Sequence, residues 1–363
     1  MPIDFTPTDE QALVVETVRQ FAENEIRPRA RAADEAHKPA DEAIQAAHAL
    51  GLVANGLPSE HGGGGERSAV LGALVAEELA WGDLATALAI LSPALVAYPV
   101  ADQGSSAQQK SFLPRYTRDA FVPGALALLE PGFGADAFRP RTQARREGAS
   151  FVLDGRKCMV PWLAGGDTVL VSADAGGTPQ LFLVPRDAQG LVATPDFYMG
   201  IQALPTVELA LSGVRVPAEA RLGGERGADL ARLIARGRVA LAALGVGVAR
   251  AAFEVARDYA KEREAFGSKI AQKQAIAFLL AQMAIEIDGA RLLTWEAAWQ
   301  LDQGETALRE ATLAIDQVRR IALDVADGAV QVFGGHGYIR EYLPELALRN
   351  ARGFASFEAL ALV

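Results

Sequence analysis

Residues 331–358 read QVFGGHGYIREYLPELALRNARGFASFE, and the prediction of the fold starts from this stretch. The apolar side chains that lead into it recur at helical spacing, and Gly334 and Gly335 then predict the end of that helix. Pro344 suits the first turn of a second helix, which carries the chain towards the carboxylate of Glu358. On pattern alone, the stretch indicates two packed helices joined by a glycine turn.

The rest of the C-terminal third continues the helical pattern, with long runs rich in alanine and leucine that predict an antiparallel bundle. The four helices are expected at residues 228–262, 269–302, 306–333 and 344–357. Within the first of them, Gly245 and Gly247 partly mimic a dinucleotide-binding fingerprint. No strand precedes them, so we reject a Rossmann fold and interpret these glycines as positions of close helix packing.

Towards the N-terminus the hydrophobic period changes. Residues 121–222 hold short β-rich runs between Asp-Gly, Gly-Gly and proline signals, which predict a small antiparallel β domain. Residues 1–120 predict a helical domain whose first helix starts near Thr6. Its further helices are expected at 41–50, 71–91 and 107–116. The predicted fold is therefore α+β and mostly helical: an N-terminal helical domain, a small middle antiparallel β domain, and a C-terminal antiparallel four-helix bundle at 228–363.

The composition is that of an ordinary globular protein, with 50% apolar and 22% charged residues in 363. A net charge of −10 argues against a general surface for nucleic acid or anionic membrane. The longest strongly apolar run, residues 239–249, is too short to cross a bilayer, so no membrane span is predicted. A single cysteine excludes an intrachain disulfide, and the polar first residues carry no secretory core; together these features predict a cytoplasmic location.

Several kinds of chemistry find no support in the sequence. The four histidines and Cys158 lack metal-ligand spacing, so no metal site is predicted. The glycine run at 62–65 is not followed by Gly-Lys-Ser/Thr, which excludes a P-loop. A Gly-x-Ser-x-Gly elbow for nucleophilic serine chemistry is also missing from the sequence.

Two ordered motifs resemble those of the acyl-CoA dehydrogenase family. QVFGGHGY, followed by RNA and a Phe-Glu pair, is similar to the family's C-terminal signature. Residues 259–284, YAKEREAFGSKIAQKQAIAFLLAQMA, resemble its best-known segment, and the match runs in order along nearly the whole chain. The resemblance implies a FAD-dependent enzyme that acts on an acyl-CoA and assembles as a homo- or hetero-oligomer, usually a homotetramer built as a dimer of dimers.

The resemblance further implies that the FAD of one subunit is held at its ADP end by the neighbouring subunit. The residues that match the two ADP-facing motifs are Arg263, Phe266, Gln274, Gln331, Gly334 and Gly335. A guanidinium can bond a pyrophosphate, an aromatic ring can cover adenine, and bare glycine backbone permits a close approach.

The motifs that meet the flavin ring depart from the family pattern. LEPGFGAD resembles Thr-Glu-Pro-Gly-x-Gly-Ser-Asp, with Leu129 in place of a flavin-contacting Thr and Ala135 in place of a Ser. DGRKCMVPW resembles Asn-Gly-x-Lys-x-Trp-Ile-Thr-Asn, with Met159 at the Trp position and Pro161 at the position of a flavin-bonding Thr. Leucine, alanine and proline side chains cannot donate these hydrogen bonds, so weaker binding of the ring is expected.

Glu358 aligns with the family's catalytic carboxylate. The resemblance implies that it removes the α-proton of an acyl-CoA thioester while a hydride passes from the β-carbon to flavin, which yields the 2,3-enoyl-CoA. Arg236 matches an arginine that the family keeps near the active site. Ala235 stands where some members carry the base instead, which leaves Glu358 as the candidate. Ala359 replaces the glycine that normally follows the base, and the last residues, ALALV, offer only apolar side chains.

Three hypotheses follow from the sequence. The leading one is an acyl-CoA dehydrogenase whose electron acceptor is an electron-transfer flavoprotein. The second is a catalytically weak or inactive subunit of similar fold that completes the FAD site of a partner in a hetero-oligomer, as the intact ADP motifs and altered ring motifs suggest. The third is an apolar helical scaffold without a ligand, which leaves the motifs around Arg263 and Gln331 unexplained.

Overall fold

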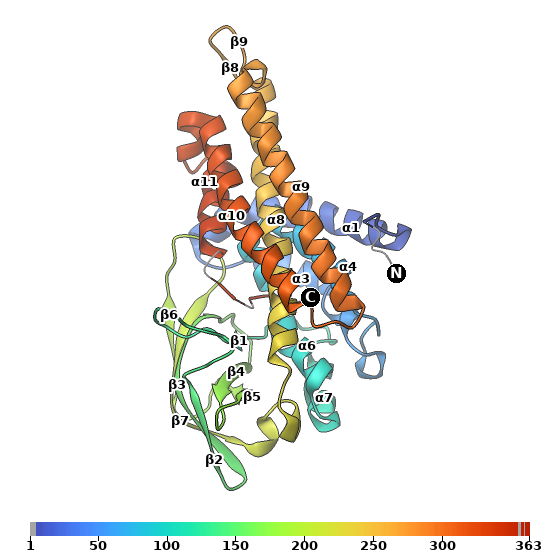
Figure 1. Cartoon of the computed structure of the whole chain (residues 1–363), viewed down its shortest axis with the longest axis vertical. Helices are drawn as coiled ribbons and strands as arrows, with labels where there is room; N and C mark the ends of the chain where they lie inside the picture. The colour runs from blue at the N-terminus through green and yellow to red at the C-terminus, as the bar shows by residue number, and fades with distance from the viewer. Residues whose placement is uncertain (1–4, 355–356, 359) are drawn as a thin grey trace.

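The computed structural model describes residues 5–354, 357–358 and 360–363. Long C-terminal helices run along the length of the molecule, with a β-sheet beside one end of them and a two-stranded hairpin at the other end (Figure 1). Shorter N-terminal helices pack against the middle of the long ones. The predicted class, α+β and mostly helical, is confirmed.

The N-terminal helices begin where their sequence provides caps. Thr8 and Gln11 form a capping box at the start of α1. A π-turn and a 3-10 turn that contains Pro28 then bend the chain into α2. These helices are α1 (Asp9–Phe21), α2 (Ala30–Ala36), α3 (Asp41–Ala49), α4 (Ala69–Gly82), α5 (Leu84–Leu91), α6 (Ala94–Gln103) and α7 (Ser106–Phe112).

The single helix predicted over 71–91 is wrong, because Asp83 divides it into α4 and α5. Asp83 adopts an extended conformation with a φ of −166°, and its side chain accepts a hydrogen bond from the backbone N–H of Thr86 at 2.8 Å. The pattern also misses α6, which contains Pro99 in its interior. Almost all of α6 is buried, so tertiary packing outweighs the cost of the proline.

The middle of the chain forms one seven-stranded sheet with the order β1-β4-β2-β3-β7-β6, in which β5 pairs with the outer side of β4. Its strands are β1 (Leu126–Ala127), β2 (Gln143–Glu147), β3 (Ser150–Pro161), β4 (Thr168–Asp174), β5 (Pro179–Pro185), β6 (Leu191–Asp196) and β7 (Thr206–Pro217). Most pairs are antiparallel as predicted, but β1 and β2 each pair with β4 in parallel, so the sheet is mixed. The two-residue β1 is too short to show an alternating pattern in the sequence.

In the described residues of the C-terminal part there are four α-helices, close to the predicted ranges. They are α8 (Leu230–Glu262), α9 (Gln274–Asp302), α10 (Leu308–Phe333) and α11 (Leu343–Phe354). Between α8 and α9 the chain makes the hairpin of β8 (Glu264–Ala265) and β9 (Ser268–Lys269), which the sequence does not predict. The hairpin lies at the tip of the long helices (Figure 1).

The glycines of α8 allow close helix packing, as the sequence predicts. A Cβ on Gly245 would lie 2.4 Å from Val318 of α10 and 2.7 Å from Phe354 of α11. A Cβ on Gly247 would lie 2.3 Å from the backbone oxygen of Glu77 in α4. Any larger side chain at either position would therefore push neighbouring helices apart.

Two stretches, 84–103 and 230–262, are long and apolar enough to span a membrane by length and hydropathy alone. Inside this fold, 94% and 78% of their most apolar windows are buried. The apolar character of both stretches is accounted for by the protein core that they form.

Candidate active site

The first ADP-facing motif lies at the exposed tip of the long helices. Arg263 follows α8 directly, and Phe266 lies in the β8–β9 turn with a φ of +54° and a side chain that is 97% exposed. Gln274 and Gln331 are exposed at the start of α9 and near the end of α10. Within the part of the chain that the structure describes, the Arg263 guanidinium makes no hydrogen bond or ion pair. It is available to an anion from outside the subunit.

The second ADP-facing motif adjoins the first. Tyr259, one turn before the hairpin, stacks on Phe333 at 3.9 Å between ring centroids, and its hydroxyl lies 3.0 Å from Nδ1 of His336. These contacts tie the end of α8 to the turn that contains Gly334 and Gly335. A Cβ added to either glycine would meet no atom within 4 Å, so the backbone there is open. The donors and open backbone at this tip fit the ADP half of FAD.

The four residues predicted at the flavin ring belong to the β domain. The N–H of Cys158 donates to the carbonyl of Leu129 at 3.1 Å, which brings the two ring-facing motifs together. Leu129 and Met159 are half-buried, Ala135 is exposed, and Pro161 is buried in β3. Met159 has a φ of +56° and lies where the register between β3 and β7 shifts. None of these four side chains can donate a hydrogen bond, so a flavin ring here would depend on backbone groups and apolar contacts.

The two sets of predicted FAD residues belong to separate parts of the subunit: the ADP set to the tip of the long helices, and the ring set to the β domain, where Met159 packs against the helical core. The β8–β9 hairpin is at the top of Figure 1, and β2, β3 and β7 extend to the bottom. The structure therefore brings together the residues within each set, but it does not bring the ADP set to the ring set of the same chain.

A buried ion pair supports the ring-facing motifs. Lys157 is fully buried, and its Nζ lies 2.9 Å from both Oε1 of Glu130 and Oγ of Ser172. Glu130 also accepts hydrogen bonds from the backbone N–H and hydroxyl of Thr142, at 2.8 and 2.6 Å. Burial acts to raise the pKa of Glu130, but the charge of Lys157 and these hydrogen bonds outweigh it and lower the pKa to about 2. Glu130, which follows Leu129 in the chain, is thus held ionised.

Glu358 lies where the C-terminal segment meets the helices. Phe357 packs edge-on against Tyr198, which follows β6, at 5.7 Å between ring centroids. The Glu358 side chain is buried, and its Oε1 accepts a hydrogen bond from Nε of Arg238 at 2.6 Å. Its Oε2 accepts from Nη2 of Arg319 at 3.0 Å. The residue is therefore a buried, doubly paired carboxylate rather than a solvated one.

Arg236 contacts a different part of the segment. Its Nη1 donates to the carbonyl of Val363 at 2.6 Å, and its Nε lies 3.8 Å from Asp102. Burial lowers the pKa of Arg236 to about 10. Arg236 thus holds the end of the segment, and the ion pairs of Glu358 are made by other arginines.

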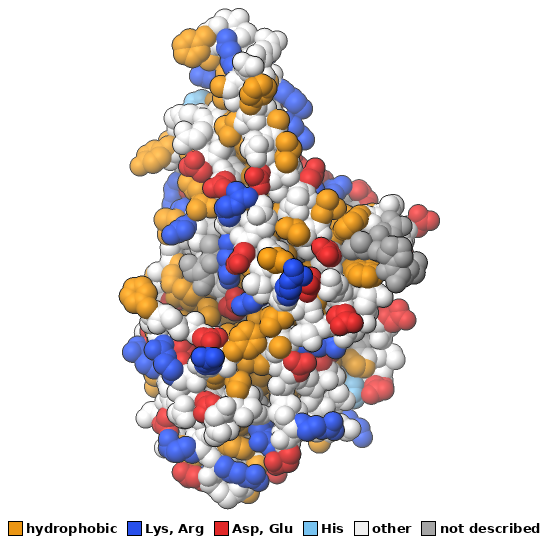
Figure 2. Space-filling model, viewed as in Figure 1, with side chains coloured by type: hydrophobic (Ala, Val, Ile, Leu, Met, Phe, Trp, Pro, Cys, Tyr) orange, Lys and Arg blue, Asp and Glu red, His pale blue; other side chains and the backbone are white. Residues whose placement is uncertain are grey.

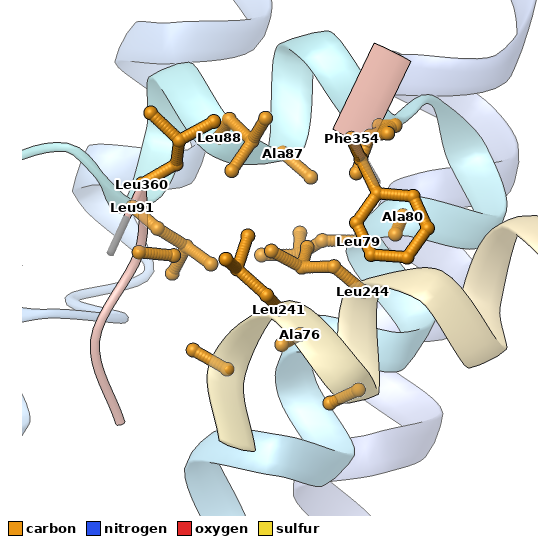
Figure 3. Close-up of a cluster of buried hydrophobic side chains, with 14 of the residues drawn as sticks. Ala76, Leu79, Ala80, Ala87, Leu88, Leu91, Leu241, Leu244, Phe354 and Leu360 are labelled. Atoms are coloured by element: carbon orange, nitrogen blue, oxygen red, sulfur yellow. The ribbon is translucent and has the colours of Figure 1, made fainter. Parts of the chain in front are cut away.

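The apolar residues after Glu358 pack into the core. Leu360 lies beside Leu91, and Phe354 points into the same cluster, which α4, α5 and α8 complete (Figure 3). Residues 360–363 are all buried. Ala359, which stands in place of a glycine in the family motif, lies outside the described residues.

Arg238 and Arg319 are the site residues that the sequence reasoning missed. Arg238 is a charged residue inside a largely buried part of α8, which is an unusual position for a cation without a partner. Thr312, Asp316 and Arg319 recur at helical spacing and thus share one face of α10. These patterns indicate that both arginines pair with a buried anion, but the sequence does not identify that anion.

Both helical parts of the chain match domains of a known protein family. Residues 8–120 match the N-terminal domain of acyl-CoA dehydrogenases, and residues 226–358 match their C-terminal domain. The chain is 35% identical to the cyclohex-1-ene-1-carbonyl-CoA dehydrogenase of Syntrophus aciditrophicus, over 95% of this chain and 85% of the relative.

Solved structures of other proteins share the fold. Butyryl-CoA dehydrogenase from Megasphaera elsdenii superposes with a TM-score of 0.88 at 30% identity, over 97% of this chain and 95% of that one. A chain from a structure of the electron transferring flavoprotein of Acidaminococcus fermentans superposes with a TM-score of 0.90 at 29% identity, over 98% and 95% of the two chains.

Proposed function

Because the chain belongs to the acyl-CoA dehydrogenase family, whose members are FAD-dependent oxidoreductases, we propose that it oxidises an acyl-CoA thioester to the 2,3-enoyl-CoA with Glu358 as the base. The observation that carries this proposal is the placement of Glu358. Its side chain is buried at the contact between the β-domain segment that holds Tyr198 and the helices α8 and α10.

The proposed chemistry assigns one step to Glu358. A carboxylate oxygen takes the proton from the α-carbon while the electrons of that C–H bond move towards the thioester carbonyl. Stabilisation of the developing negative charge on the carbonyl oxygen is assigned to the backbone N–H of Glu358. FAD, when bound, supplies the acceptor for the hydride of the β-carbon. Arg263, Gln331 and the open backbone at Gly334 would hold its ADP half for a neighbouring subunit.

We infer that the assembly shares its FAD sites between subunits, because the ADP set lies at the tip of the long helices whereas the ring set lies in the β domain, away from the β8–β9 hairpin (Figure 1). The exposed face of α9 offers a surface for a second copy. Phe278, Ile285 and Leu292 recur every seven residues and are 65%, 66% and 43% exposed. Figure 2 shows apolar side chains among charged ones along this side of the long helices.

An electron-transfer flavoprotein is the proposed electron acceptor, and a cytoplasmic location stays a prediction.

A supporting, non-catalytic subunit is the second candidate. The observations in its favour are the Arg263 guanidinium, which has no partner among the described residues, and the lack of side-chain donors at Leu129, Ala135 and Pro161. Such a chain would bind the ADP end of a partner's FAD and hold no flavin ring itself.

The absorption spectrum of the protein purified alone separates the two candidates. If the chain is an enzyme, we expect a flavin band with one FAD per subunit, and anaerobic bleaching of that band by an acyl-CoA. Butyryl-CoA and cyclohex-1-ene-1-carbonyl-CoA are the first substrates to test, because relatives act on them according to their names. A colourless protein that gains FAD only when mixed with a homologous partner would contradict the enzyme and favour the supporting subunit.

Arg263→Ala should weaken FAD retention by about tenfold or more, since it removes a charge-assisted hydrogen bond to the pyrophosphate. The measurement is the FAD dissociation constant of the oligomer, followed by flavin fluorescence. Arg257→Ala is the matched control, because Arg257 lies on α8 two turns earlier and pairs with the exposed Asp258. Equal FAD affinity in both variants would show that Arg263 does not hold the cofactor.

A further inference from the structure

Two arginines from different helices converge on the side chain of Glu358. Arg238 of α8 is itself fixed by Thr312, whose hydroxyl accepts from Nη1 of Arg238 at 2.6 Å and donates to the carbonyl of Leu308 at 2.6 Å. Arg319 of α10 holds the backbone as well as the side chain, because its Nη2 donates to the carbonyl of Phe357 at 2.9 Å and to Glu358 at 3.0 Å. The carboxylate is thus anchored at both oxygens.

This pairing opposes proton transfer to Glu358 as long as it persists. Each oxygen of Glu358 accepts a charge-assisted hydrogen bond, and such bonds are stronger than those between neutral groups. Each oxygen keeps a second lone pair that can take a proton, but proton uptake neutralises the carboxylate and so weakens both charge-assisted bonds. Release of one arginine before the transfer removes part of that opposition.

The surroundings of the two arginines differ, and the difference indicates which one moves. Arg238 is 19% exposed and is anchored by both Thr312 and Glu358. Arg319 is 28% exposed, and its buried Nε has no hydrogen-bond partner among the described residues. A second carboxylate, Asp316, lies one turn earlier on α10, with Oδ1 3.8 Å from Nη1 of Arg319. Arg319 can therefore exchange Glu358 for Asp316 and keep an ionic partner.

We propose that Arg319 is a gate on Glu358: it holds the carboxylate at rest and shifts to Asp316 to free one oxygen, while Arg238 stays bound and orients the other oxygen. The proposal rests on Glu358 as the base. In the open state, the free oxygen takes the α-proton and the C–H electron pair moves to the thioester carbonyl. Arg238 and Arg319 are positioning residues, because they act through Glu358.

The test isolates proton removal from hydride transfer. A 3-thia-acyl-CoA has sulfur at the β-position, so its α-proton can be removed although no hydride can follow, and the resulting anion gives a long-wavelength absorption band with the oxidised flavin. Stopped-flow measurement with the holoenzyme reports the rate of that band and the affinity for the analogue. We expect Arg319→Met to speed its formation about tenfold, with the affinity nearly unchanged.

Three further variants define the gate. Asp316→Asn should slow formation of the band, because Arg319 loses its second carboxylate. Arg238→Met should slow it through loss of orientation, and Arg238→Lys should restore part of the rate. Arg320→Met is the control, since Arg320 neighbours Arg319 but pairs with Glu286 and Asp324. A rate in Arg319→Met equal to or below that of the unmutated enzyme would overturn the gate.

A second measurement does not depend on turnover. In a double-mutant cycle of Arg319→Met and Glu358→Gln, the shifts in thermal midpoint should be non-additive, because the two residues contact each other. Additive shifts would overturn the proposal even if the enzyme is active. If the band forms neither with the unmutated protein nor with any variant, the proposed function fails. The double-mutant cycle still decides whether Arg319 and Glu358 form an ion pair.

Discussion

Replacement of Glu358 by glutamine should slow α-proton removal at least about 100-fold, on the usual scale of general-base catalysis. Glutamine keeps the shape of the side chain and the backbone N–H, but an amide does not accept a proton from a thioester α-carbon. Binding of FAD and acyl-CoA should stay nearly unchanged, because the residues assigned to the ADP half lie at the far tip of the subunit. The measurement is the anaerobic bleaching of the flavin by acyl-CoA, which needs no electron acceptor.

The control for this experiment is Glu345→Gln, in a carboxylate of α11 that pairs with Arg349 at 2.8 Å and has no place in the proposed chemistry. Glutamine at 358 can accept from only one of the two arginines, so some loss of stability is expected and should be measured alongside. Bleaching at the normal rate in Glu358→Gln would refute Glu358 as the base.

Replacement of Glu130 by glutamine should destabilise the protein by about 3 kcal/mol or more at pH 7, because it leaves the fully buried Lys157 without its ionic partner. The folded pKa of Glu130, about 2, lies below the ordinary value of 4.5. Its stabilising effect is therefore fully present above about pH 4.5 and is lost as the pH falls towards 2. The variant should lack this part of the pH dependence.

Thermal unfolding at pH 7 and at pH 3 measures both effects. Glu208→Gln is the matched control, since Glu208 pairs on the same sheet with the exposed Arg156 and should contribute less than about 1 kcal/mol. The double variant Glu130→Gln with Lys157→Met should recover part of the loss, because it removes the buried amine that has lost its ionic partner. Equal losses in Glu130→Gln and Glu208→Gln would show that burial does not strengthen the pair.

The sequence by itself determined the four C-terminal helices and the glycine turn at their tip, because these depend on local patterns. Helical spacing and caps placed the four C-terminal helices, and the Gly334-Gly335 turn needs only its own backbone to stay open. The sequence did not predict the mixed pairing of the sheet or the division of one helix into α4 and α5 at Asp83. A two-residue strand carries no periodic signal, and an aspartate inside an apolar run marks a cap only once its hydrogen bond to Thr86 is known.

Only the tertiary structure decided what surrounds Glu358. The sequence points to a carboxylate near Arg236, whereas the folded chain pairs it with Arg238 and Arg319, which are 120 and 39 residues away. Arg236 and Arg238 are two positions apart on one helix and so point in different directions, and the path of residues 357–363 determines which arginine meets the carboxylate. A guanidinium in a buried helix needs an anion, but its identity depends on packing between distant segments, which local spacing does not encode.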